Sequence, residues 1–249
     1  MRPFDDIRSF FSLLADEIAY VGQYLRRRRG VLPGEITRQA YQMGYRSFPI
    51  IALITFLIGI TISLTSAAQL KMFGAGIYLA DLIGIAMINE LVPLMVGIML
   101  AGKIGASITA EISTMKVMDE LDALTTMGLV PVKFLMVPRL IAITLVVPLL
   151  VALADFVGIA GGVLVGKITM GTPTSVFVRE VIASVTLHDF LIGLGKTMVF
   201  GWAVVAAAGY KGFSLDRGAE GVGKATTEAV VLSIALIIAL DCVFAFFVY

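Results

Sequence analysis

The sequence predicts an all-α membrane protein with an N-terminal amphipathic interfacial helix, five transmembrane helices and a short cytoplasmic helix between the second and third spans. Hydrophobic residues make up 59% of the 249 residues, and the mean hydropathy is +0.97. A soluble domain is only about half apolar, so this composition indicates a membrane protein. Five apolar runs and a strongly uneven distribution of Lys and Arg complete the prediction.

Charge and cysteine content exclude several classes of protein. The formal net charge is +1, which points to no particular partner, and we expect no nucleic-acid partner. Cys242 is the single cysteine, so the chain can form neither an intramolecular disulfide nor a thiolate metal site. The first residues carry Asp5, Asp6 and Asp16 and no continuous apolar core, so we do not expect a cleavable signal peptide.

Residues 1–29 are expected to form an amphipathic helix. Apolar residues recur at three- and four-residue spacing, and the segment ends in the run from Arg26 to Arg29. Such a helix can lie in the membrane interface with its arginines toward anionic head groups. A soluble helix packed on a partner is the alternative. We assign residues 1–47 to this helix and its linker, and residues 48–249 to one five-span domain.

The five spans have lengths near the roughly 20 residues that cross a bilayer. We expect them at 48–70, 77–102, 140–165, 190–210 and 229–249. The second is expected to continue as a helix as far as Met115. The intervening loops leave no room for a separate soluble domain, although residues 169–188 can form a short external helix.

The basic residues predict the orientation. With the N-terminus inside, only Lys71, Lys167 and Arg179 of the 19 Lys and Arg residues fall in outer segments, and Lys196 lies within a span. By the positive-inside rule the N-terminus is cytoplasmic, the C-terminus is external and residues 103–139 form a cytoplasmic loop.

Small residues in the third span predict close helix packing. Gly158, Gly162 and Gly166 follow at four-residue spacing, which lets two helix backbones approach closely in lipid. The pattern fits packing within the bundle and a homodimer contact equally well.

A short amphipathic helix is expected at about 116–128. Met118, Leu121 and Leu124 would share one face, while Asp119, Glu120 and Asp122 form a charged face, with Ala123 between them. One interpretation is a docking helix for a cytoplasmic subunit. The other is a solvated loop with a helical turn.

Ionisable residues inside the spans are the next candidates. Glu90, Asp155, Lys196 and Asp241 each cost about 2.5–3.5 kcal/mol at a helix centre, so each should face the bundle interior or water. Together with Asn89, they favour a polar path, a cavity wall or a proton relay. The alternative is a structural pair, for instance Lys196 with one of the acids.

No catalytic or metal site is expected, so we predict that the chain is not an enzyme. Residues 218–224, GAEGVGK, have the glycine and lysine spacing of a P-loop, but Ala225 stands where Ser or Thr should bind magnesium. The sole histidine, His188, has no nearby nucleophile, and one His and one Cys cannot build a zinc site.

Two blocks are distinctive: NELVPL at 89–94 and LAGKIGASITAEISTMKVMDELDALTTMGLVPVKFLMVPRLIA at 100–142. Four shorter blocks accompany them: DFVGIAGG at 155–162, KTMVFG at 196–201, GAEGVGKATTEAVV at 218–231 and LDCVF at 240–244. Together these blocks resemble the MlaE/YrbE-type permeases, the membrane subunits of ABC transporters that work with MCE-domain (mammalian cell entry) lipid-binding proteins.

This resemblance implies a homodimer driven by two cytoplasmic ABC ATPase subunits, with an external MCE-domain protein and phospholipid or another hydrophobic lipid as cargo. ATP and magnesium would bind the ATPase, and this chain would hold no cofactor of its own. The location implied is a bacterial inner membrane.

The resemblance also implies roles for particular residues. The family's coupling helix maps onto Asp119 to Leu124, and its characteristic charges map onto the set Glu90, Lys103, Glu111, Lys196 and Asp241. Asn89 and Glu228 stand where some relatives have arginine. Two other functions remain open: a proton-coupled secondary transporter that uses the intramembrane charges, and a membrane scaffold that transports nothing.

Overall fold

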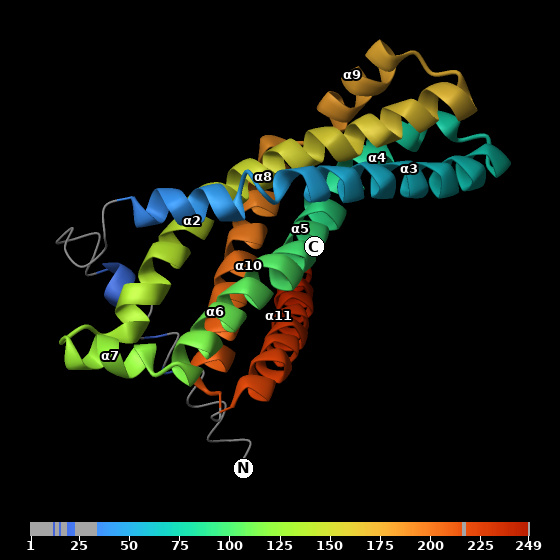
Figure 1. Cartoon of the computed structure of the whole chain (residues 1–249). Coiled ribbons are helices and arrows are strands. Elements are labelled where there is room, and N and C mark those ends of the chain that lie inside the picture. Colours follow the sequence, from blue (N-terminus) through green and yellow to red (C-terminus); the bar gives the residue numbers. More distant parts are fainter. Residues whose placement is uncertain (1–11, 13–14, 16–18, 23–33, 216–217, 249) are drawn as a thin grey trace. The chain divides into compact units, whose positions relative to one another are not determined.

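The computed structural model describes residues 12, 15, 19–22, 34–215 and 218–248 (Figure 1). Every regular element within them is helical, which confirms the predicted all-α fold class. The elements are α2 (Glu35–Met43), α3 (Phe48–Met72), η1 (Gly76–Tyr78), α4 (Leu79–Ala86), η2 (Met87–Leu91), α5 (Val92–Leu100), η3 (Ala101–Gly105), α6 (Ala106–Val117), α7 (Glu120–Thr126), α8 (Pro131–Met170), α9 (Thr174–Ser184), α10 (Leu187–Phe213) and α11 (Ala219–Val248).

Five helical segments are long and apolar enough to cross a membrane, which confirms the predicted number of spans. They are Glu35–Met72, Leu79–Val117, Pro131–Met170, Leu187–Phe213 and Glu220–Val248. The second contains two π-helical turns, η2 and η3, and η2 includes Asn89 and Glu90. The third begins at Pro131 rather than near Leu140, because proline at the first helical position costs no hydrogen bond.

The amphipathic helix predicted at 1–29 lies almost entirely outside the described residues. Residues 12, 15 and 19–22 are described, and they are helical. The external helix predicted within 169–188 corresponds to α9.

The chain divides into two compact units. Unit 1 comprises Met1–Tyr45, Gly97–Val146 and Met198–Tyr249, and unit 2 comprises Arg46–Val96 and Val147–Thr197. Helices α5, α8 and α10 contribute residues to both units.

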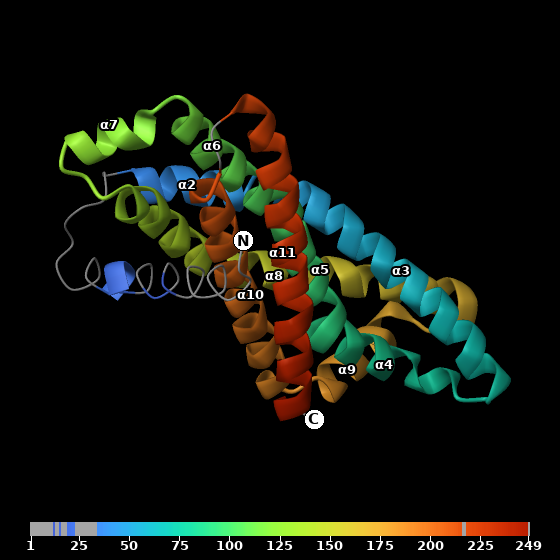
Figure 2. The same cartoon turned by 90° about the horizontal axis from the view of Figure 1, so that it is seen from below.

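In unit 1, α6 runs beside α10 and α11 (Figures 1 and 2). Glycines permit this approach: a Cβ at Gly105 would lie 3.1 Å from Val204 Cγ1, and one at Gly212 would lie 2.9 Å from Ile112 Cβ. The buried hydroxyl of Thr109 donates to the carbonyl oxygen of Ala208 at 3.1 Å, which adds a polar link between α6 and α10. Helix α7 connects the ends of α6 and α8.

In unit 2, the glycines of α8 lie against other helices of the same chain. A Cβ at Gly158 would meet Met87 and the backbone of Thr55, one at Gly162 would lie 2.8 Å from Ile83 Cγ2, and one at Gly166 would lie 2.7 Å from the Phe177 ring. Gly84 of α4 similarly faces Val181 of α9, at 3.1 Å from an added Cβ. Neighbours within unit 2 therefore occupy the face that the four-residue glycine spacing presents.

Candidate functional site

Helix α7 is a short element bounded by two left-handed residues. Asp119, with φ of 58°, ends the turn after α6, and Gly128, with φ of 76°, follows α7. The Leu129 N–H donates to the Leu124 carbonyl at 3.0 Å, which closes the C-terminus of α7. The helix predicted at about 116–128 is therefore shorter in the structure, because the left-handed backbone at Asp119 separates it from α6.

The two faces of α7 differ in exposure. Leu121 and Leu124 are buried, whereas Asp119, Glu120, Asp122 and Ala123 are exposed. Met118 does not share the leucine face as predicted. It lies in the turn outside α7, and its side chain is 65% exposed.

Lys116, at the end of α6, anchors this region to another helix. Its Nζ donates to the carbonyl oxygen of Phe213, the last residue of α10. A cation at this position neutralises the partial negative charge of a helix C-terminus. The chain therefore enters α7 from a fixed point.

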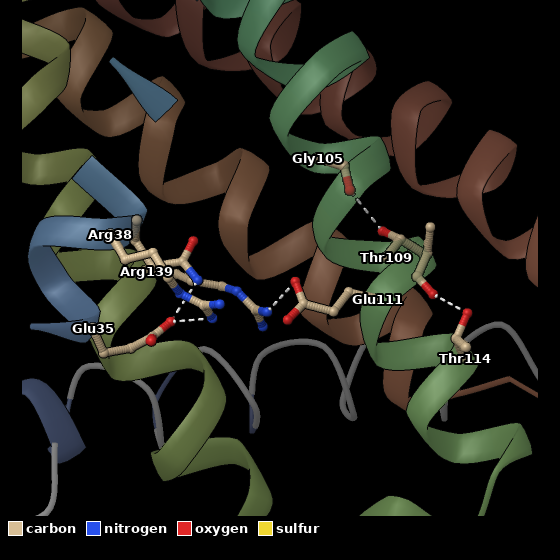
Figure 3. A network of polar contacts seen from close by, with 9 residues as sticks. Glu35, Arg38, Gly105, Thr109, Glu111, Thr114 and Arg139 are labelled. Carbon is tan, nitrogen blue, oxygen red and sulfur yellow. Dashed lines mark hydrogen bonds and ion pairs between the residues drawn. The ribbon is translucent and has the colours of Figure 1, made fainter. Parts of the chain in front are cut away.

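Glu111 and Arg139 join the two helices that carry α7. Arg139 Nη2 of α8 lies 2.7 Å from Glu111 Oε2 of α6, and Figure 3 shows Arg139 between Glu111 and Glu35 of α2. Glu35 accepts hydrogen bonds from Arg38 and Gln39, both at 2.9 Å. Three segments of unit 1 thus meet in one network of charges.

The sequence did not single out Arg139 or its pairing with Glu111. One signal could have suggested it: Glu111 lies in the last two turns of α6 and Arg139 in the third turn of α8, on the two helices that flank α7. Opposite charges at similar distances from α7 along these two helices are candidates for an ion pair.

A second ion pair lies within unit 2. Lys196 of α10 is buried and pairs with Glu90 of η2, and it also donates to the backbone carbonyl of Asn89 at 3.3 Å. A π-helical turn inserts one extra residue into a helix and often marks a functional position. The ion pair between Lys196 and one of the acids, which the sequence left open as the structural alternative, is present.

The remaining candidate charges lie elsewhere. Lys103 belongs to η3 and Asp241 to α11. Asp155 of α8 is buried, and its Oδ1 has no hydrogen-bond partner among the residues that the structure describes. Glu228 pairs with Lys211 at 2.8 Å, across the connection between α10 and α11.

The segment that resembles a P-loop does not form a phosphate-binding loop. Instead, α11 already begins at Ala219 and includes Gly221 and Gly223. The hydroxyls of Thr226 and Thr227 donate to carbonyls one turn earlier, as they do in a continuous helix.

The region around His188 has a local structural role. Asp189, its neighbour, accepts hydrogen bonds from the backbone N–H and the hydroxyl of Thr186, which caps the start of α10. Within the described part of the chain, no group of three His, Cys, Asp or Glu side chains could hold a metal ion.

Comparison with known proteins agrees with this architecture. The family model described as Permease MlaE matches residues 36–247. A Rickettsia typhi protein named "Probable ABC transporter permease protein" is 38% identical over 82% of this chain and 78% of its own length. Proteins with the same name description from Synechocystis and Porphyra purpurea are 32% and 31% identical, over 83% and 79% of this chain and 81% and 74% of their own lengths. This multi-pass membrane protein therefore belongs to the MlaE permease family of ABC transporter permeases.

Proposed function

We propose that the chain is the permease subunit of an ATP-driven transporter that moves phospholipid or another hydrophobic lipid between the inner membrane and an external MCE-domain lipid-binding protein. The observation that carries this proposal is α7. It is a short helix between two membrane helices, with its acidic side chains exposed and its leucines buried. A short helix with an exposed, charged face suits docking to a soluble subunit that has a complementary basic surface.

The active assembly in this proposal is a homodimer with two cytoplasmic ABC ATPase subunits. ATP and magnesium bind the ATPase subunits, and the permease chain contributes no cofactor and no catalytic group. Docking of Asp119, Glu120 and Asp122 against the ATPase brings the energy of nucleotide binding to α7.

The distribution of basic residues supports an orientation in which α7 lies on the cytoplasmic side of the membrane. Among the described residues, the basic residues assigned to the inner side lie in unit 1, except for Arg46. The three assigned to the outer side, Lys71, Lys167 and Arg179, lie in unit 2. A cytoplasmic α7 is consistent with this separation of charge.

Transport proceeds by alternation between two states. ATP binding closes the ATPase pair and draws the two α7 helices together, and the helices that carry α7 transmit this motion to a lipid cavity at the centre of the dimer. Acyl chains require an apolar cavity with few polar groups near the head-group end. The exposed apolar side chains of α11, among them Val231, Ile238 and Phe246, offer a surface for lipid or for the second copy.

Charge reversal on α7 tests the docking. The variant combines Asp119→Lys, Glu120→Lys and Asp122→Lys, and the matched control is Glu180→Lys on α9 in unit 2. We expect the triple variant to lose co-purification with the ATPase subunits or to hydrolyse ATP without transferring phospholipid, and the control to do neither. Unchanged assembly and unchanged coupled transfer in the triple variant would rule out α7 as the docking element.

The same reconstituted system separates the other functions. Fluorescent phospholipid in vesicles, transferred to the MCE-domain protein only with ATP, supports the proposal. Transport by the purified chain alone, driven by a proton gradient, would identify a secondary transporter. ATPase association without any lipid transfer would identify a scaffold.

A further inference from the structure

We propose that Arg139 is a positioning residue for the proposed docking helix: its ion pair with Glu111 clasps α6 to α8, so that displacement of α7 moves both helices together. The clasp rests on the proposed function only in that coupled lipid transfer is one of its two readouts.

The position of the pair supports this role. Glu111 lies in the last two turns of α6, and Arg139 lies in the third turn of α8, so the 2.7 Å contact closes the helical hairpin just behind α7. Lys116 ties the end of α6 to Phe213, and Thr109 ties the same helix to Ala208. With the clasp, α6, the start of α8 and the end of α10 form one block within unit 1.

Stability alone does not explain a buried arginine at this place. The Arg139 side chain is 2% exposed, and its Nε and Nη1 have no hydrogen-bond partner among the described residues. Burying a guanidinium is costly, and a buried ion pair with unsatisfied donors is often no more stable than apolar residues of the same size. A group kept in spite of this cost points to a geometric role.

Because Arg139 is buried and Glu111 is half exposed, a variant that removes only the arginine can test the ion pair. Glu111 is 46% exposed, so Arg139→Met leaves no charge stranded in the interior and fills the same space. We therefore expect Arg139→Met to fold with an unfolding temperature at or above that of the parent protein. A merely structural role for Arg139 predicts a lower unfolding temperature.

The first measurement concerns the geometry of α7 and needs no ATPase. In a Cys242→Ser background, spin labels at Ala123→Cys on α7 and Thr227→Cys on α11 report a distance within unit 1, in the full chain in nanodiscs. Both positions are exposed. We expect a narrow distance distribution in the parent, a broader one in Arg139→Met, and an intermediate one in Arg139→Lys, which retains a cation for Glu111. Arg38→Met is the matched control, because it removes an exposed arginine of the same network.

The second measurement is lipid transferred per ATP hydrolysed by the reconstituted complex. Coupling through a positioning network corresponds to about a two- to thirty-fold change, and we expect a loss in this range for Arg139→Met and none for Arg38→Met. An unchanged distance distribution in Arg139→Met overturns the clasp, whatever the transport result. A broadened distribution with no binding of ATPase to the parent chain retains the clasp and instead contradicts the proposed function. If Arg139→Met does not fold, the structural role is correct and the clasp is rejected.

Discussion

Lys196 of α10 and Glu90 of the π-helical turn η2 form an ion pair inside unit 2. The Lys196 side chain is 3% exposed, against 36% for Glu90. A lone charge inside a membrane protein is expensive, so each partner makes the other tolerable. The π-helical turn also brings the carbonyl of Asn89 within 3.3 Å of the same ammonium group.

The first prediction is that Glu90 and Lys196 are energetically coupled. Glu90→Gln and Lys196→Met should each lower stability, and the double variant should be more stable than the two separate losses imply, by about 0.5–3 kcal/mol. Thermal unfolding in detergent for the four proteins gives this coupling energy. The exposed pair of neighbours Arg179 and Glu180 is the control, with a coupling of about 0–1 kcal/mol. Additive effects at Glu90 and Lys196 would contradict the prediction.

The second prediction concerns close backbone packing between α3 and α8. A Cβ at Gly161 would lie 2.5 Å from the carbonyl oxygen of Phe56 and 3.1 Å from the backbone nitrogen of Ile60. Backbone atoms cannot turn aside as a side chain does, so Gly161→Ala must displace α3. We expect a loss of about 1–3 kcal/mol in thermal unfolding experiments.

Gly195 provides the matched control for this substitution. It is helical, in α10, and an added Cβ would meet no atom within 4 Å. Gly195→Ala should therefore be neutral or stabilise by up to about 1 kcal/mol, because alanine favours a helix. Equal losses at both glycines would mean that the packing of α3 on α8 does not depend on the glycine.

The number of spans was predictable because a long apolar run has few stable conformations other than a membrane helix. The ends of the helices were less predictable. Pro131 begins α8 and Pro138 lies within it, whereas the sequence predicted a third span that starts only at residue 140. Gly221 and Gly223 likewise lie within the first turns of α11. The backbone hydrogen bonds of this long apolar helix outweigh the low helix propensity of the two glycines.

The candidate site was predictable in its composition and not in its pairing. Glu90 and Lys196 stand out as charges inside apolar spans, and Glu111 was named only through the family resemblance, but the partners of all three depend on how distant helices meet. Arg139 was not among the residues that the sequence singled out. Its burial beside Glu111 became visible once α6 and α8 were placed together.

The third prediction separates the charge of Asp119 from its backbone conformation. With φ of 58°, Asp119 is the one residue other than glycine with positive φ in the described part of the chain. Glycine adopts this conformation freely, whereas a β-branched residue is penalised by about 1–2 kcal/mol. Asp119→Gly and Asp119→Asn should keep α7 in place and lose only the charge, while Asp119→Val should also displace the helix.

Binding of the ATPase subunits to the permease in nanodiscs measures this difference. We expect Asp119→Gly and Asp119→Asn to weaken binding similarly, and Asp119→Val to weaken it further. Equal binding by all three variants would show that the left-handed turn has no role in presenting α7.

The fourth prediction fixes the orientation of the chain. Thr125 on α7 and Arg179 on α9 are both exposed, and the proposed topology places them on opposite sides of the membrane. In the Cys242→Ser background, a membrane-impermeant maleimide added to intact cells with a permeabilised outer membrane should label Arg179→Cys and not Thr125→Cys. Disruption of the inner membrane should then make both accessible, which controls for the reactivity of each thiol. Labelling of Thr125→Cys in intact cells would invert the topology and would remove α7 from the compartment that supplies ATP, so the docking proposal depends directly on this result.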